Sequence, residues 1–307
     1  MTDVRRRRLR VSLLVYLVLL LISTIVRRSV SHSAPVAGMR VLPVRAIALG
    51  RPASSEIELA FVDTAPGSHS IPVILVHGSP GSSRIFRSLT AALSTSFRMI
   101  VPDLPGFGAS SRNLPDYSFR AHARYLLELL DALRLPKAQF VGFSMGGGVV
   151  LSLADLAPQR VASIAMISAI GVQEQELLGS YSANHFLHGA LLAGLWLFRE
   201  ALPHFGQLDG FDLNVEFARN FYDSDQRPLR SILQNYRGPM LIIHGTRDTH
   251  VPAAAAIEHH RLVPQSELKM IDGDHFMVFQ RPGLIVVPLE DFLRRAEGAA
   301  MGGIDDY

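Results

Sequence analysis

The first residue of the chain that suggests chemistry is a serine set among glycines. Ser144 lies in the run Gly142-Phe143-Ser144-Met145-Gly146, between an apolar stretch typical of a buried strand and a helical pattern. A turn this tight needs small neighbours, because the backbone on both sides approaches the strand and the helix closely. The pattern is typical of a nucleophile elbow, which exposes the serine hydroxyl for attack. A serine that only capped a helix would leave the flanking glycines unexplained.

A serine hydroxyl needs a base to take its proton and an acid to orient that base. Asp248 follows the strand pattern PMLIIHG, and His275 follows the strand pattern SELKMID. Because the carboxyl ends of parallel strands meet at one edge of a sheet, both side chains are expected beside Ser144. Asp272 and Asp274 are rival acids, but they flank His275 too closely in sequence to reach its distal ring nitrogen easily. We therefore predict a catalytic triad of Ser144, Asp248 and His275.

Acyl transfer also needs hydrogen-bond donors for the oxyanion that develops in its transition state. The stretch His77-Gly78-Ser79-Pro80-Gly81 follows the strand pattern PVILVH, so its backbone is expected at the same edge of the sheet. We predict that the backbone N–H of Ser79 and that of Met145 form the oxyanion hole. His77 itself is expected to make a structural hydrogen bond to a neighbouring loop.

Strand and helix patterns alternate along the chain and position these residues. Continuous apolar strands separated by helices indicate a parallel sheet covered on both faces, which predicts an α/β fold. Residues 44–49 and 57–63 are expected to form a hairpin ahead of the alternating part. The later strands are predicted at residues 72–77, 97–103, 138–143, 161–168, 239–245 and 266–272, and the helices at 83–93, 119–133, 145–156, 253–262 and 284–296.

Residues 171–236 interrupt this alternation. They are mostly helical in composition and contain the single tryptophan, Trp196, so we interpret them as an insertion over the sheet. Trp196 from this insertion is expected to line the substrate site together with Phe107, Phe143 and Phe276. The predicted division is an anchor and linker at residues 1–40, a first core part at 41–170, a helical cap at 171–238, a second core part at 239–298 and a tail at 299–307.

The composition restricts the partners and cofactors. The 307 residues contain 30 basic and 27 acidic side chains, and seven of the arginines lie within the first 28 residues. The rest of the chain is mildly acidic, so no nucleic-acid partner is predicted. The absence of cysteine excludes disulfides, zinc–thiolate sites and a cysteine nucleophile. His185 and His188 have no third ligand nearby in the sequence, so no metal site is predicted.

An apolar segment, VSLLVYLVLLLISTIV, lies between Arg10 and Arg27 and has no charge, proline or glycine. As a helix it would span about 24 Å of a hydrocarbon core of about 30 Å, with the flanking arginines extending toward the headgroups. We predict that residues 11–26 form an uncleaved membrane anchor, the alternative being a signal sequence whose cleavage releases a secreted domain. The dense arginine cluster before the segment favours an extracytoplasmic catalytic domain.

Together these motifs resemble the α/β-hydrolase superfamily. The resemblance is carried by the loops at residues 77–81 and 103–108, the glycine run at 142–148, Asp248 and His275. It covers about residues 41–297. It implies an eight-stranded, mostly parallel sheet, a cap inserted before the acid-bearing strand, and no cofactor.

The same resemblance narrows the reaction. Ser144 disfavours the haloalkane dehalogenases and epoxide hydrolases, which have aspartate at the elbow, and Phe276 stands where carbon–carbon bond hydrolases usually have tryptophan. We predict a serine hydrolase that acts on carboxylic esters of apolar acyl substrates through an acyl-enzyme, with a small-molecule ester as its substrate. Amidase, thioesterase or perhydrolase chemistry on the same triad, and a noncatalytic ligand-binding role, are the alternatives. The sequence does not predict an oligomeric state.

Overall fold

The centre of the fold is an eight-stranded sheet with the strand order β1-β2-β4-β3-β5-β6-β7-β8. The computed structural model describes residues 3–29, 38–48, 51–68, 70–210 and 213–302. β1 and β2 form an antiparallel hairpin, β2 pairs antiparallel with β4, and the pairings from β4 to β8 are parallel. The strands are β1 Met39–Ala48, β2 Arg51–Asp63, β3 Val73–Val76, β4 Met99–Pro102, β5 Ala138–Phe143, β6 Val161–Ile167, β7 Met240–Gly245 and β8 Glu267–Ile271. The predicted mostly parallel, eight-stranded sheet is confirmed.

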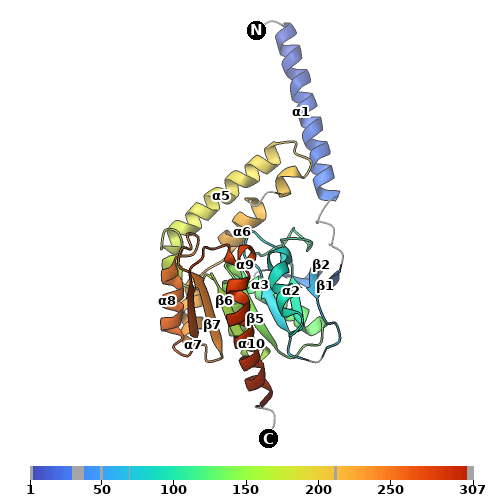
Figure 1. Ribbon diagram of the computed structural model, residues 1–307. Helices are drawn as coiled ribbons and strands as arrows, with labels where there is room; N and C mark the ends of the chain where they lie inside the picture. Colours follow the sequence, from blue (N-terminus) through green and yellow to red (C-terminus); the bar gives the residue numbers. More distant parts are fainter. Residues whose placement is uncertain (1–2, 30–37, 49–50, 69, 211–212, 303–307) are drawn as a thin grey trace.

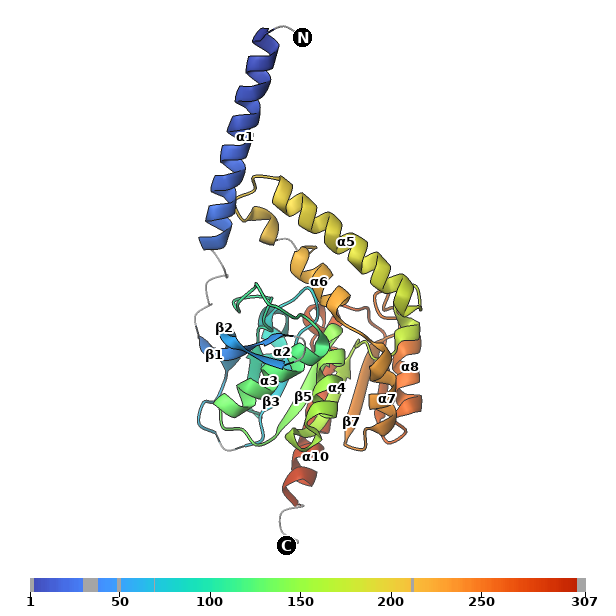
Figure 2. The same ribbon diagram turned by 180° about the vertical axis from the view of Figure 1, so that it is seen from behind.

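Helices cover both faces of this sheet (Figures 1 and 2). Side chains of α2, α9 and α10 form one hydrophobic core with the sheet, and side chains of α3, α4, α7 and α8 form the other. The α-helices are α1 Asp3–Ser29, α2 Arg87–Leu93, α3 Phe119–Ala132, α4 Met145–Leu156, α5 Tyr181–Ala201, α6 Val215–Asp223, α7 Arg227–Asn235, α8 Ala253–Leu262, α9 Met277–Gln280 and α10 Gly283–Gly302. The 3₁₀ helices are η1 Ser83–Phe86, η2 Pro158–Arg160, η3 Gln173–Gln175 and η4 Gln207–Gly210.

The short strand β3 shows why the central strands are apolar without alternation. All four of its residues are fully buried. Val73 and Leu75 point into the core formed with α2 and α10, whereas Ile74 and Val76 point into the core formed with α3 and α4. Because successive side chains of a strand point to opposite faces, a strand covered on both faces must be apolar at every position.

The predicted elements are present, with some differences in length. α4 begins and ends at the predicted residues, whereas both hairpin strands extend beyond 44–49 and 57–63. The helix predicted at 83–93 is divided into η1 and α2, because the Ser82 side chain accepts a hydrogen bond from the Arg84 N–H and starts the 3₁₀ turn. The short helix α9, which begins two residues after His275, was not predicted.

The inserted stretch contributes to two parts of the fold. α5 and α6 pack against each other beyond the carboxyl edge of the sheet, as Figure 2 shows. α7 instead packs against α4 and α8, and its Leu229 and Leu233 are buried in the core. We therefore use the name cap for α5, η4 and α6 alone.

The helix α1 extends away from the sheet and contacts the cap at its carboxyl-terminal half (Figure 1). Arg27 forms an ion pair with Glu200 at 2.9 Å, and the Ser23 hydroxyl oxygen accepts a 2.8 Å hydrogen bond from the Phe205 N–H. By length and hydropathy, residues 3–27 of this helix are able to cross a membrane, and only 6% of the apolar window is buried. A signal sequence near the N-terminus has the same properties.

Candidate active site

Ser144 occupies a strained turn between β5 and α4. Its backbone angles, φ of 54° and ψ of −119°, lie in a region that residues other than glycine rarely adopt. The turn is held by its own backbone, since the Ser144 N–H donates to the carbonyl of Ile167 at 3.1 Å. The Ser144 carbonyl in turn accepts from the N–H groups of Gly147 and Ile170 at 3.0 and 3.1 Å. These bonds fix the direction in which the hydroxyl is presented.

The glycines around Ser144 leave no room for a side chain. A Cβ on Gly142 would lie 2.7 Å from the carbonyl oxygen of Gly146, and a Cβ on Gly146 would lie 2.2 Å from that of Val76. A Cβ on Gly78 would lie 2.9 Å from the Cβ of Ser144. The loop after β3 therefore lies directly against the serine, where the sequence predicts the oxyanion hole.

The structure brings the three predicted triad side chains together. The Oγ of Ser144 lies 3.1 Å from Nε2 of His275, and Nδ1 of the same ring lies 2.8 Å from Oδ2 of Asp248. Asp248 follows β7 and His275 follows β8, so each side chain lies at the carboxyl edge of the sheet. The rival carboxylates point elsewhere: Asp272 pairs with an exposed arginine, and Asp274 accepts from the N–H of the residue after His275.

The Asp248 carboxylate is oriented by the backbone. Its Oδ1 accepts hydrogen bonds from the N–H groups of His250 and Val251, both at 2.9 Å. Burial raises the pKa of Asp248, but the hydrogen bond from His275 and the two backbone N–H groups outweigh it and hold the pKa below its ordinary value. The carboxylate is therefore charged at neutral pH and accepts from Nδ1–H, which leaves Nε2 of His275 free to accept the hydroxyl proton of Ser144.

His250 lies beside the predicted base and was not predicted from the sequence. The exposed His250 ring stacks on His275 with 4.8 Å between ring centroids, and its edge contacts the Phe276 ring. One group of side chains in the described part of the chain is compact enough to hold a metal ion. It consists of Asp248, His250 and His275, whose ligand atoms all lie within 4.8 Å of one another. The Asp248–His275 hydrogen bond already uses one ligand atom of each.

His77 plays the structural role predicted for it. Its Nε2 accepts a 2.9 Å hydrogen bond from the Leu104 N–H, so Nδ1 carries the ring proton and donates to the carbonyl of Gly78 at 2.7 Å. Burial lowers the pKa of His77, which keeps the ring neutral. The ring thereby ties the loop after β3 to the loop after β4, and it does not contact Ser144 as a second base.

Two cavities open beside the serine. A cavity of about 680 Å³ is lined by Ser144, His275 and five phenylalanines. Three of these, Phe107, Phe143 and Phe276, were predicted to bind substrate. The other two, Phe217 and Phe279, were not predicted. A second cavity of about 270 Å³ also reaches Ser144 and His275. Apolar residues from α6 and from the loop that follows β6 line it, together with polar side chains that include Glu176, His188 and Gln226. Volumes of this size suit small ligands with apolar parts.

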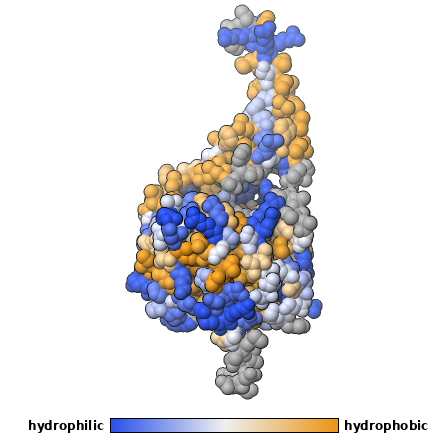
Figure 3. Space-filling model, viewed as in Figure 1, coloured by the Kyte–Doolittle hydropathy of each residue, from blue (hydrophilic) through white to orange (hydrophobic). Residues whose placement is uncertain are grey.

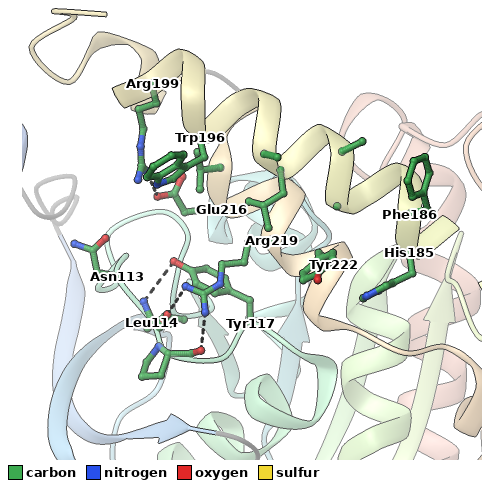
Figure 4. A pocket seen from close by; sticks show the side chains of 16 residues that line it. Asn113, Leu114, Tyr117, His185, Phe186, Trp196, Arg199, Glu216, Arg219 and Tyr222 are labelled. Atoms are coloured by element: carbon green, nitrogen blue, oxygen red, sulfur yellow. Dashed lines mark hydrogen bonds and ion pairs between the residues drawn. The ribbon is translucent and has the colours of Figure 1, made fainter. Parts of the chain in front are cut away.

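Trp196, which was predicted to contact substrate, lies elsewhere. It is 53% exposed and lines a larger cavity of about 1020 Å³ between α5 and α6 (Figure 4). The helix α6 separates this cavity from the serine: Glu216 and Arg219 face Trp196, whereas Phe217 and Phe221 face the cavities at Ser144. The prediction placed Trp196 in the acyl site because composition alone does not reveal this partition.

Comparisons with known proteins agree with this architecture. Residues 71–207 match the family model described as alpha/beta hydrolase fold. The chain is 32% identical over 248 residues to the dihydrolipoyllysine-residue acetyltransferase component of the acetoin cleaving system of Pseudomonas putida, covering 75% of this chain and 65%, just under two thirds, of that protein. It is 27% identical over 272 residues to the 2-hydroxy-6-oxo-2,4-heptadienoate hydrolase of Pseudomonas putida, covering 77% of this chain and 93% of that protein.

A solved structure shows the same fold over most of the chain. The thermophilic esterase of Thermogutta terrifontis superposes with a TM-score of 0.66 at 24% sequence identity, covering 84% of this chain and 99% of that one. At this identity the likeness concerns the fold alone. Together with the family match, it shows that this chain has the α/β-hydrolase fold.

Proposed function

We propose that this protein is a serine hydrolase that cleaves carboxylic esters of apolar acyl groups through an acyl-enzyme on Ser144. One observation carries the proposal. A continuous chain of hydrogen bonds runs from Oγ of Ser144 through the His275 ring to Asp248, with distances of 3.1 and 2.8 Å. Nucleophile, base and orienting acid within hydrogen-bond reach are the arrangement that activates a serine hydroxyl.

In the first half-reaction, Oγ of Ser144 attacks the ester carbonyl while its proton passes to Nε2 of His275. The tetrahedral intermediate collapses, the bond to the alcohol breaks, and Nε2–H protonates the leaving alkoxide. In the second half-reaction, Nε2 takes a proton from water, the resulting hydroxide attacks the acyl-enzyme, and the acid leaves as Oγ is protonated again. The charged Asp248 stabilises the imidazolium that forms in each half-reaction.

The oxyanion is assigned to two backbone donors, the N–H groups of Ser79 and Met145. Ser79 lines both cavities that reach Ser144, and the loop that carries it lies against the serine at Gly78. Met145 is the first residue of α4, so its N–H belongs to the group of helix amides that have no partner within the helix. Removing one such donor from an oxyanion hole costs about 100- to 1000-fold in rate.

The substrate class follows from the lining of the cavities at Ser144. Phenylalanine side chains from four separate segments surround the serine, with Phe107 and Phe143 from the core, Phe217 from the cap, and Phe276 next to the base. An apolar acyl group gains about 0.8 kcal/mol for each methylene that it buries among such side chains. The phenylalanines therefore support an ester of an apolar acid.

A fluorophosphonate probe tests the nucleophile directly. The full chain in detergent is expected to be labelled, and the Ser144→Ala variant is expected not to be. Hydrolysis of p-nitrophenyl esters of graded chain length then tests the substrate class, and thioester and amide analogues test the alternative leaving groups. Equal labelling of both proteins would refute the assignment of Ser144. Labelling with hydrolysis of the thioester or the amide alone would favour those leaving groups, and neither labelling nor hydrolysis would favour the ligand-binding alternative.

Cleavage of a carbon–carbon bond is a second candidate reaction, which one relative suggests. The Pseudomonas putida 2-hydroxy-6-oxo-2,4-heptadienoate hydrolase matches over 93% of its length, so cleavage of a carbon–carbon bond in a substrate of that kind is the second candidate. It would use the same Ser144 and His275. Turnover of that compound at a rate above that of every simple ester would favour this reaction over ester hydrolysis.

We also propose that α1 anchors the protein in a membrane, with the catalytic domain on the extracytoplasmic side. Its apolar segment is exposed along nearly its whole length, as expected of a helix whose natural surroundings are lipid. The full chain is then expected in the membrane fraction after washing with high salt. Recovery of a soluble protein that has lost about thirty residues would favour a cleaved signal sequence instead.

A further inference from the structure

The helix α5 buries polar side chains and exposes apolar ones, which is the opposite of a surface helix in a soluble protein. Only two of its 21 residues, Asn184 and His188, are buried, and both are polar. Three leucine and phenylalanine side chains that do not line the cavity between α5 and α6 are largely exposed: Leu187 is 43% exposed, Leu197 62% and Phe198 54%. A helix on the surface of a soluble protein buries its apolar side and exposes its polar side.

The exposed apolar side chains of α5 form one continuous stripe. Positions four, seven or eleven residues apart share a helix face, and the positions related in this way carry no charged or polar side chain. We call this stripe the outer face of α5; its members are Leu187, Gly194, Leu197 and Phe198. A Cβ on Gly194 would have no neighbour within 4 Å, so nothing in the described part of the chain covers the stripe there.

The outer face is continuous with the apolar surface of α1 (Figure 3). The Tyr16 hydroxyl donates to the carbonyl of Ala201 at the end of α5, and Arg27 pairs with Glu200. Along α1 these two contacts are about 16 Å apart, so the end of α5 lies level with the apolar segment of α1. At this junction Glu200 pairs with Arg27 and with Arg199, and Arg199 also pairs with Glu216, so these four charges balance, as an apolar surrounding requires.

The Ser144 site lies on the side of the molecule where α1 and the cap lie. The carboxyl edge of the sheet, where β5 leads into Ser144, lies beneath the cap, and α1 leaves the molecule on that side (Figures 1 and 2). The C-terminal helix α10 extends from the opposite side. A membrane that holds α1 would therefore meet the cap before any other part of the catalytic domain.

We propose that the outer face of α5 inserts into the bilayer leaflet nearest the catalytic domain, beside α1, and that the Ser144 site takes esters dissolved in that leaflet. The inference rests on the anchor and on the hydrolase proposed above. A lipid surface is the occupant because the outer face continues the surface of the one helix that is able to span a bilayer among the described residues. Apolar faces of interfacial helices penetrate about 5–10 Å into a bilayer.

The absence of cysteine allows a direct test of insertion. Single cysteines are introduced at Leu197 and Phe198 on the outer face, at Leu14 in α1, and at Ile257 in α8. Ile257 is the matched control, since it is an apolar residue of a different helix and is 56% exposed. Each full-length variant is labelled with an environment-sensitive fluorophore and reconstituted into phosphatidylcholine vesicles with or without lipids that carry a quencher in the acyl chain.

Quenching is expected at Leu197→Cys, Phe198→Cys and Leu14→Cys, by about twofold or more, and not at Ile257→Cys. Quenching at Leu14→Cys alone would overturn the insertion of α5 and leave the anchor in place. Quenching at none of the positions would overturn both. Quenching at Ile257→Cys as strong as at the outer face would also overturn the proposal, because the insertion would not be specific to α5.

A second measurement separates the proposed substrate source from the hydrolase itself. The double variant Leu197→Glu/Phe198→Glu changes two residues that do not line the cavities at Ser144. It is expected to retain its activity on water-soluble p-nitrophenyl acetate and to lose at least about fivefold on a long-chain ester embedded in vesicles. Ile257→Glu is expected to change neither rate. Equal rates for wild type and double variant on the embedded ester, or an equal loss on both substrates, would overturn the proposal.

Discussion

Replacing Asp248 by asparagine removes the charge of the acid and keeps its size. In the structure, Oδ1 accepts N–H bonds from His250 and Val251, and only an oxygen is able to accept both. The amide nitrogen of the asparagine must therefore take the place of Oδ2, which lies 2.8 Å from Nδ1 of His275. Because this NH₂ group donates, Nδ1 has to accept, and the ring proton moves to Nε2. This is the nitrogen that faces Ser144.

With Nε2 protonated, His275 is unable to take the hydroxyl proton of Ser144. The same substitution in a serine protease triad lowers kcat by about 10⁴, which corresponds to about 5.5 kcal/mol in the activation free energy. We expect a loss of this order in kcat for Asp248→Asn with little change in KM, because Asp248 does not line either cavity at the serine. Steady-state hydrolysis of p-nitrophenyl acetate measures both constants, and a thermal melt shows that the variant is folded.

Asp274→Asn is the matched control. Its carboxylate is exposed and accepts a 2.9 Å hydrogen bond from the Phe276 N–H, so the substitution is expected to change kcat by less than about threefold. A larger loss for Asp274→Asn than for Asp248→Asn would show that Asp248 is not the orienting acid. Retention of more than about a tenth of the activity by Asp248→Asn would contradict the tautomer argument itself.

Three further outcomes are expected. Ser144→Gly should melt about 2 °C or more above Ser144→Ala, because glycine relieves a backbone strain of about 1–3 kcal/mol at a φ of 54°; equal melting temperatures would contradict this strain. Burial lowers the pKa of His122 to about 3, so the unfolded chain binds a proton below about pH 6.5 that the folded chain does not bind, and stability falls from there down to about pH 3. His122→Phe should therefore flatten the dependence of the melting temperature on pH in this range, and an unchanged slope would refute the cause. Phe217→Ala should raise KM for long acyl esters more than for acetate and Trp196→Ala should not, since only Phe217 lines the cavities at the serine; the reverse result would restore Trp196 as the acyl contact.

The sheet and the elbow were predictable because strong physical requirements act on a few residues. Strands such as Val73–Val76 are apolar at every position only when both faces are covered, which indicates a parallel sheet with helices on each side. Asp248 and His275 are 27 positions apart in sequence, yet both follow a strand and must emerge at the same edge. The glycines around Ser144 are required by a turn that a Cβ would block.

The cap was not predictable in the same detail. Glu216 and Phe217 are neighbours in the sequence, but they face different cavities, because the helix α6 lies between the two cavities. Composition shows that the insertion is apolar and helical, and it does not show which of its residues face the serine. His250 was missed for a similar reason, since a loop histidine close to Asp248 has no spacing that predicts a stacked ring.

The contacts between α1 and the cap have a consequence for any soluble form of this protein. Removing α1 removes Arg27, one of the two arginines that pair with Glu200, and the acceptor of the Phe205 N–H, and it exposes the end of α5 that α1 covers. The cap supplies Phe217 to the cavity at Ser144, so a disturbed cap changes the lining of this cavity although Ser144, Asp248 and His275 are retained. A truncated domain is therefore expected to keep the chemistry of the triad and to lose part of its acyl selectivity. Selectivity is best measured on the full chain in a bilayer.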